Sequence, residues 1–177
     1  GFALLYTNTV ATDFLIFEDS GNEQIVIRQD SNGAVCIDRA STQLAISSGA
    51  LSRDTWFFIE AKVVIANSGG SVAVRVNGAD FVSVTNADTQ ATTNASANAI
   101  RFYNGGASNT GRFDDIYILD STGSPNDFLG DHRVRTLLPA ADDVVQFARS
   151  TGAYNYANVD DATPDDDTTY NESDVIG

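Results

Sequence analysis

Short apolar runs alternate along the chain with clusters of glycine, asparagine, aspartate and serine. Many runs place apolar residues at every second position, which is the period of a half-buried β-strand. The predicted strands are Phe2–Tyr6, Phe14–Glu18, Gln24–Arg28, Ala34–Asp38, Gln43–Ile46, Trp56–Ile65, Ser71–Val76, Phe81–Val84, Ile100–Tyr103 and Arg112–Leu119. Many short strands separated by turn residues favour an all-β sandwich or barrel over an α/β fold. The only helix that the pattern allows is one short turn within Asn126–Arg133.

The clearest local signal is a hairpin in the middle of the chain. Val72, Val74 and Val76 share one face of a strand, because alternate residues of a strand point the same way. Asn77-Gly78 follows at once, and this dipeptide is the strongest short signal for a two-residue hairpin turn. The pattern therefore predicts an antiparallel pair with one buried face.

The core is expected to form from the apolar faces of these strands. Its candidate residues are Phe14, Ile16, Ile25, Ile27, Val35, Trp56, Phe58, Val64, Val72, Val74, Val76, Ile100, Phe102, Ile116 and Ile118. Trp56 is placed in the core because it belongs to the most apolar of the predicted strands, where a large ring gains most from burial. Cys36 is the only cysteine and lies in an apolar run, so we expect a small buried side chain and no disulfide.

The composition changes near residue 140. Apolar residues become sparse, and residues 160–167 form an acidic run that contains Pro164. Such a segment cannot bury enough apolar surface to fold alone. We therefore predict one β domain over residues 1–140, followed over residues 141–177 by an extended acidic arm or a linker to a further domain.

The chain is strongly acidic, with 24 Asp and Glu residues against ten Lys and Arg residues and a formal net charge of −14. This charge repels phosphate backbones and anionic lipid headgroups, so we expect no nucleic-acid partner and no membrane partner. No run approaches the roughly 18 apolar residues that a membrane-spanning helix needs.

Six segments share sequence features with one known class of protein modules. They are Thr55–Lys62 (TWFFIEAK), Asn67–Gly78 (NSGGSVAVRVNG), Asp88-Thr89, Phe113–Gly123 (FDDIYILDSTG), Asn126–Pro139 (NDFLGDHRVRTLLP) and Asp165–Tyr170. Together they resemble the concanavalin A-like and laminin G-like jelly-roll modules of bacteriophage structural proteins. The part of the chain before Gly33 matches these modules only in the spacing of its predicted strands.

This resemblance implies a two-sheet antiparallel jelly-roll sandwich with the acidic arm at its C-terminal end. It also implies an extracellular virion protein, either a tail or fibre-type component or a capsid decoration protein. The implied partners are other virion proteins, and the implied assembly is a homo-oligomer. Because a fold does not fix a function, a carbohydrate-binding, lectin-like adhesin module that recognises a host-surface glycan stays open as an alternative.

The acidic residues do not form a recognisable catalytic pair. Glycoside hydrolysis needs two carboxyl groups roughly 5–9.5 Å apart that flank the scissile bond. The glutamates are Glu18, Glu23, Glu60 and Glu172, and none belongs to a paired motif. Asp114 and Asp115 are adjacent, so on a strand they point to opposite faces. His132 is the only histidine, and no nucleophile-elbow motif accompanies it, so we predict a non-enzymatic protein.

One metal ion is compatible with the sequence. Ca²⁺ takes six to eight oxygen ligands from carboxylates, amides and carbonyls. The candidate ligands are Asp114, Asp115, Asp120 and Asp88. In the alternative interpretation these carboxylates hydrogen-bond to backbone amides of loops or are solvated. The spacing matches no EF-hand-like calcium loop, so both interpretations stay open.

Glycan recognition needs exposed aromatic rings beside polar groups in a concave patch. The candidate contact residues, for a glycan or for a protein partner, are Tyr103, Asn104, Tyr154 and Tyr156. Each of these tyrosines could equally pack in the core or against a neighbouring subunit. The sequence alone does not choose between these roles.

Overall fold

The computed structural model describes residues 1–7, 11–104, 111–133, 139–142, 148–150, 152–159 and 171–172. It divides the chain into two units, Gly1–Arg133 and Val134–Gly177. Within the described ranges, no helix is both long enough and apolar enough to cross a membrane.

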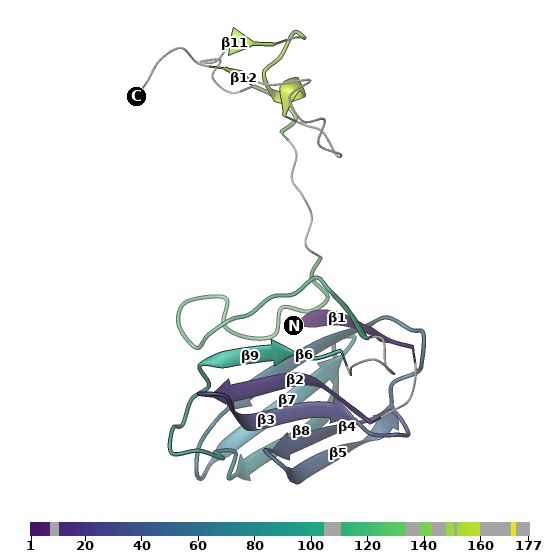
Figure 1. Ribbon diagram of the computed structural model, residues 1–177, viewed down its shortest axis with the longest axis vertical. Helices are drawn as coiled ribbons and strands as arrows, with labels where there is room; N and C mark the ends of the chain where they lie inside the picture. The colour runs from purple at the N-terminus through teal and green to yellow at the C-terminus, as the bar shows by residue number, and fades with distance from the viewer. Residues whose placement is uncertain are drawn as a thin grey trace. The chain divides into compact units, whose positions relative to one another are not determined.

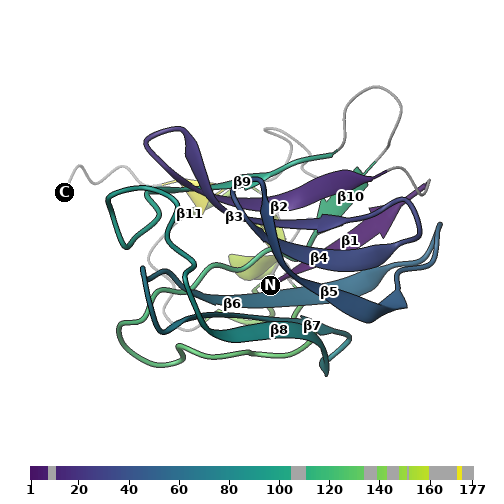
Figure 2. The ribbon, with the colours of Figure 1, turned by 90° about the horizontal axis from the view of Figure 1, so that it is seen from below.

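Two antiparallel five-stranded sheets face each other in the first unit (Figure 1, Figure 2). Sheet A has the strand order β10-β1-β6-β7-β8, and sheet B has the order β5-β4-β3-β2-β9. The strands of sheet A are β1 (Phe2–Tyr6), β6 (Phe57–Val64), β7 (Gly70–Val76), β8 (Ala79–Ala87) and β10 (Gly111–Asp114). The strands of sheet B are β2 (Thr12–Asp19), β3 (Asn22–Gln29), β4 (Ala34–Arg39), β5 (Thr42–Ala50) and β9 (Ala99–Phe102). The predicted all-β, two-sheet jelly-roll sandwich is therefore confirmed.

The hairpin formed by β7 and β8 confirms the prediction from the Asn-Gly dipeptide. Val76 pairs with Ala79, and the two residues between them, Asn77 and Gly78, both have positive φ angles of 50° and 79°. Two positive φ angles define the turn type that matches the twist of paired strands. Val72, Val74 and Val76 are all buried on the inner face, as the alternation predicts.

The core lies between the two sheets. Its buried residues are Phe2, Leu4, Tyr6, Phe14, Leu15, Ile25, Ile27, Val35, Ile37, Leu51, Ile59, Val72, Val74, Val76 and Val82. Aromatic rings fill one side of this layer, and Phe2 meets Phe102 edge-on with the ring centroids 5.2 Å apart. Edge-to-face contacts of this kind add to the free energy gained from burial alone.

Four of the predicted core residues are wrong, because their side chains are exposed. Trp56 is 47% exposed and lies one residue before the start of β6. Val64, at the other end of β6, is also 47% exposed. Ile116 and Ile118 follow the end of β10, which is shorter than the predicted strand Arg112–Leu119. Apolar composition alone did not show where these strands end.

The strand β10 ends at Asp114 because the next residue leaves the extended conformation. Asp115 has a φ of 50°, a left-handed conformation that ends a strand and that aspartate tolerates better than most residues. Residues 115–133, here called the strap, then run along the outer side of sheet A (Figure 2). The strap is described throughout and contains no helix, so the short helical turn that the pattern allows within Asn126–Arg133 does not form.

The strap is fixed to sheet A by side chains of two of its strands, β6 and β7, and by Gly1. The ring of Tyr117 stacks on Phe58 of β6 with centroids 6.3 Å apart, and the guanidinium of Arg75 on β7 lies 4.2 Å from the ring centroid of Phe128. The Tyr117 amide also donates to the Gly1 carbonyl at 2.9 Å. These contacts cover the outer face of the sheet with an irregular segment.

The outer face of sheet B is built differently. Ile16, Val26 and Cys36 are fully buried although they do not belong to the inter-sheet core. On the same face, the Nε of Arg28 lies 2.5 Å from an Oδ of Asp38. The long arginine side chain can cover apolar neighbours with its methylene groups while its charge is paired.

The second unit contains a two-stranded sheet and one 3₁₀ turn. Strand β11 (Ala148–Arg149) pairs with β12 (Asn171–Glu172), and the turn η2 spans Tyr156–Asn158. The carboxylate of Asp142 accepts hydrogen bonds from the backbone amides of Asn155 and Tyr156 at 2.9 and 2.7 Å. The predicted acidic run at residues 160–167 lies outside the described residues.

Candidate functional site

A polar hollow lies at one end of sheet A, and we call it the Trp56 cleft. Its volume is about 350 Å³. It is lined by Ala3, Trp56, Phe57, Phe58, Asn77, Asp114, Asp115, Asp131 and Arg133. An exposed indole therefore shares one hollow with carboxylates, a guanidinium and a side-chain amide.

The fold brings these side chains together from four places in the chain. Trp56 precedes β6, and Asn77 forms the turn between β7 and β8. Asp114 ends β10, and Asp115 turns the chain into the strap. The end of the strap returns to the same region and supplies Asp131 and Arg133.

Internal hydrogen bonds hold part of the cleft in place. The Oδ1 of Asn77 accepts a hydrogen bond from the Phe58 amide at 2.8 Å, which fixes its side chain at the start of β6. The Oδ1 of Asp114 accepts from the Asp115 amide at 2.8 Å. Because the Asn77 bond uses only the oxygen, the two N–H donors of this amide stay available to a ligand.

The predicted calcium ligands are not brought together. Asp114 and Asp115 line the Trp56 cleft, whereas Asp88 is ion-paired with Arg39. The Oδ1 of Asp120 accepts from the amide and the hydroxyl of Thr122 at 2.9 and 2.7 Å, and these two bonds hold its pKa below the usual value. Within the described residues, no group of three or more His, Cys, Asp or Glu side chains is placed to hold a metal ion.

The predicted glycan-contact residues divide between the two units. Tyr103 and Asn104 belong to the first unit, whereas Tyr154 and Tyr156 belong to the second. The carbonyl of Tyr103 accepts a hydrogen bond from the Tyr6 hydroxyl at 2.9 Å, and Arg101 lies 5.9 Å from the centre of its ring. Tyr154 and Tyr156 stack on each other with centroids 5.5 Å apart.

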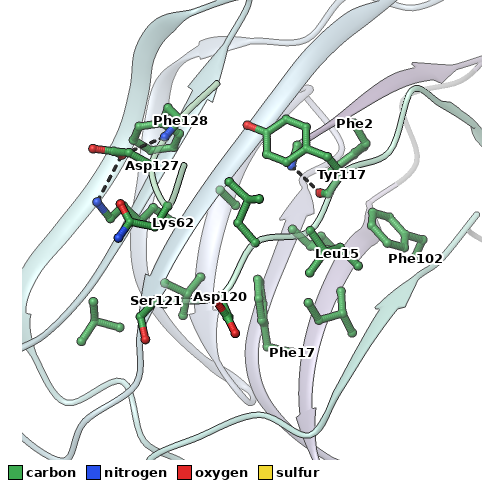
Figure 3. Close-up of a pocket in the computed structure, with 18 residues that line it drawn as sticks. Phe2, Leu15, Phe17, Lys62, Phe102, Tyr117, Asp120, Ser121, Asp127 and Phe128 are labelled. Carbon is green, nitrogen blue, oxygen red and sulfur yellow. Dashed lines mark hydrogen bonds and ion pairs between the residues drawn. The ribbon is translucent and has the colours of Figure 1, made fainter. Parts of the chain in front are cut away.

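A second, more apolar hollow lies between the sheets, beside the strap. Its volume is about 330 Å³, and its wall is formed by β2, β6, β9 and the strap (Figure 3). The labelled residues around it are Phe2, Leu15, Phe17, Lys62, Phe102, Tyr117, Asp120, Ser121, Asp127 and Phe128. At its rim the Nζ of Lys62 pairs with an Oδ of Asp127 at 3.1 Å. The Phe128 amide and Lys62 both hold the pKa of Asp127 below its usual value.

Sequence reasoning missed three residues of the Trp56 cleft. It placed Trp56 in the core and gave no role to Asp131 or Arg133. The position of the tryptophan beside the polar residues Asp54 and Thr55 was the one available signal, because strand ends are where side chains leave the core. The meeting of the strap with the start of β6 depends on the tertiary fold and has no local signal.

Comparisons of the chain with protein-family models, with curated proteins and with solved structures found no match.

Proposed function

We propose that this chain is a non-enzymatic structural component of a bacteriophage particle, either a tail or fibre-type component or a capsid decoration protein. Two lines support the proposal. The segments between Thr55 and Tyr170 resemble modules of phage structural proteins, and two of their described residues, Glu60 and Thr89, make buried hydrogen bonds that hold the fold together.

The observation that carries the proposal is the role of Glu60, the one glutamate in those segments. Glu60 is only 1% exposed. Its Oε1 accepts hydrogen bonds from the Tyr117 hydroxyl at 2.5 Å and from the Gly130 amide at 2.9 Å. A carboxylate in this position binds the strap to sheet A and has no access to a substrate.

Thr89, which also belongs to those segments, has a comparable role. It is fully buried, and its Oγ1 donates to the Val64 carbonyl at 2.8 Å and accepts from the Ala66 amide at 2.9 Å. A Cβ placed on Gly70 would lie 2.0 Å from this oxygen, so glycine at position 70 leaves the room that Thr89 needs. These two residues fix the end of β6 to the following strands.

Immunogold labelling of purified phage particles, with an antibody against the recombinant chain, tests the proposal. Label over the head supports capsid decoration, and label confined to the tail supports a tail or fibre-type component. Particles treated with antibody that has been pre-absorbed on the recombinant chain provide the control. Absence of label from intact and from gently disrupted particles contradicts the proposal.

The oligomeric state gives a second, independent test. Virion structural proteins work in symmetric copies, so we expect the recombinant chain to form a homo-oligomer. Light scattering coupled to size-exclusion chromatography measures its mass in solution. A monomer across the whole accessible concentration range would weaken the proposal of a symmetric appendage.

A further inference from the structure

We propose that the apolar hollow beside the strap is a slot for an extended segment of another polypeptide chain, which adds as a strand to the open edge of β6. This inference goes beyond the structural role proposed above and does not depend on it. Three observations carry it: an edge of sheet A that is only partly paired, backbone groups that point into the hollow, and the apolar side chains around it.

The edge of β6 that faces β1 is only partly paired. Strand β1 pairs with residues 57–59 of β6, whereas β7 pairs with β6 as far as Val64. Among the described residues, residues 61–64 therefore have no strand partner on the β1 side. The hollow lies at this edge, because the same residues form part of its wall.

The direction of the backbone groups follows from the pairing. The Phe58 amide donates to the Asn77 side chain and the Phe58 carbonyl accepts from the Asn77 amide, both at 2.8 Å, so Phe58 points toward β7. Successive residues of an antiparallel strand direct their N–H and C=O groups to opposite sides. Ala61 and Val63 therefore direct theirs away from β7 and into the hollow, where they have no backbone partner among the described residues.

The wall opposite β6 is apolar. Sheet B contributes Leu15 and Phe17 from β2 and Ile100 and Phe102 from β9 (Figure 3). Side chains of directly paired residues lie on the same face of a sheet. The residues of an added strand that pair with Ala61 and Val63 would therefore point at this wall. We expect apolar residues at alternate positions of the inserted segment.

Exposed apolar side chains gather at the same place. Val64, Ile118 and Leu119 all line the hollow and are 47%, 59% and 39% exposed. Exposed apolar side chains that lie together, rather than singly, are typical of interaction sites. An inserted segment would cover them, which the sandwich itself does not do.

The backbone groups favour a peptide over a lipid. A purely apolar chain would exclude water and leave the N–H and C=O groups of Ala61 and Val63 unpaired, which is costly in a buried place. A polypeptide supplies matching groups at every second residue, roughly 6.8 Å apart along a strand. Asp120 and Asp127 at the rim, together with the net charge of −14, also disfavour a carboxylate headgroup.

A synthetic peptide tests the inference with the full chain. The probe is the acetylated and amidated peptide KTVTVTK, which has valine at alternate positions and lysines that oppose the charge of the chain. Its control is the same peptide with N-methyl groups on both valines, which keeps the side chains and removes the donors that would pair with Ala61 and Val63. Calorimetry is expected to show saturable binding of the parent peptide and at least tenfold weaker binding of the control.

Amide hydrogen exchange, followed by nuclear magnetic resonance, locates the peptide. We expect saturating peptide to slow exchange of the Ala61 and Val63 amides at least tenfold. Ser83 on β8 is the reference, because it pairs with Ala73, whose backbone groups are directed to β6, so the Ser83 amide points to the outer edge of the sheet. Its exchange is expected to stay unchanged.

A pair of proline variants tests the slot from the side of the protein. Val63→Pro removes one N–H group from the slot without removing a hydrogen bond to β7 and is expected to weaken peptide binding at least tenfold. Ser83→Pro makes the same change at the outer edge of β8 and is expected to leave the affinity unchanged. Each variant is first checked for an unchanged unfolding transition, and the N-methylated peptide provides the test if Val63→Pro does not fold.

Several outcomes would overturn the inference. They are absence of binding by the parent peptide, equal affinity of the N-methylated peptide, and unchanged exchange at Ala61 and Val63. Sodium decanoate that protects these amides better than the peptide would also overturn it, because the hollow would then be a lipid site. None of these outcomes bears on the immunogold result, so the two proposals fail separately.

Discussion

Both sheets bury side chains on their outer faces, and they do so in different ways. On sheet A, Phe58 and Glu60 are buried because the strap crosses over them. On sheet B, Ile16 and Val26 are buried on a face that carries the ion pair of Arg28 with Asp38. On the same face, the loop between β8 and β9 reaches Gln24, whose amide nitrogen donates to the Asn94 carbonyl at 2.6 Å. The face of sheet A is thus covered by one long segment, whereas the face of sheet B combines a cross-strand ion pair with a loop contact at Gln24.

This difference explains where the sequence resemblance lies. The segments that carry it include Thr55–Lys62 and all of the strap except Ser124 and Pro125. A segment without regular hydrogen bonding needs particular side chains to fix its path, so it leaves a recognisable motif. The part of the chain before Gly33, which includes β2 and β3 of sheet B, matches only in the spacing of its strands, because alternation and cross-strand pairing are enough to form them.

The largest expected effect is the release of the strap by Glu60→Ala. The substitution leaves the Tyr117 hydroxyl and the Gly130 amide without their acceptor and opens a cavity under the strap. We expect a loss of about 3 kcal/mol in the free energy of unfolding, because buried groups that lose a charged partner are costly. Urea denaturation followed by circular dichroism measures the loss.

Glu60→Gln is the matched control for this substitution. The Oε2 of Glu60 is buried without a hydrogen-bond partner, so the carboxylate is not ideally solvated. Glutamine retains an acceptor oxygen at similar volume, and we expect it to cost less than half as much as alanine. Equal losses in the two variants would show that the carboxylate does not anchor the strap.

The second effect concerns the ion pair on sheet B. Arg28→Met removes the partner of Asp38, whose side chain is only 8% exposed. Removing one member of a buried pair costs up to about 3–5 kcal/mol, and the partial exposure of Arg28 reduces our expectation to about 2 kcal/mol. The double variant Arg28→Met with Asp38→Leu is expected to recover most of this loss in the same denaturation assay. A double variant less stable than the single one would show that the two side chains do more on this face than pair with each other.

A smaller effect is expected from Tyr117→Phe, at about 1 kcal/mol, because one hydroxyl that bonds Glu60 and the Leu129 amide is lost. Burial, followed by the hydrogen bond to Glu60, raises the pKa of Tyr117 from 10.0 to about 12. The native state therefore keeps this proton between those pH values while the unfolded chain loses it, so stability falls as the pH rises through this window.

The pH dependence of unfolding separates Tyr117 from other groups. Burial also raises the pKa of Tyr6, and its contribution to the alkaline loss is present in both proteins. We expect thermal melts of the wild type to lose more stability between pH 10 and pH 12 than melts of Tyr117→Phe. Parallel curves for the two proteins would show that the Tyr117 hydroxyl is not protected by the strap.

The smallest effect on stability is expected from Trp56→Ala. The indole lies in the cleft rather than in the core, so its removal should change the free energy of unfolding by less than about 1 kcal/mol. The same denaturation assay measures the change. A loss comparable to that of Glu60→Ala would mean that Trp56 packs as a core residue.

The regular parts of the fold were predictable because local pattern and tertiary structure agree there. The Asn77-Gly78 turn follows from the backbone freedom that its two positive φ angles need. The end of β10 was not predictable in this way, because Ile116 and Ile118 form a second alternating apolar run directly after Asp115 has turned the chain. The cleft was the hardest feature to predict, because Asp131 lies near Trp56 only after the strap has crossed the sheet.

Burial of the only cysteine has a practical consequence for testing whether this protein is part of a phage particle. Cys36 is fully buried, and this burial raises the pKa of its thiol, so it reacts slowly with alkylating reagents in the native protein. A cysteine introduced at the exposed position Ser83 on β8 would then be the main accessible thiol. A maleimide-linked gold cluster or dye attached there would mark a defined point on each copy of the sandwich, so that electron microscopy could orient the module without an antibody.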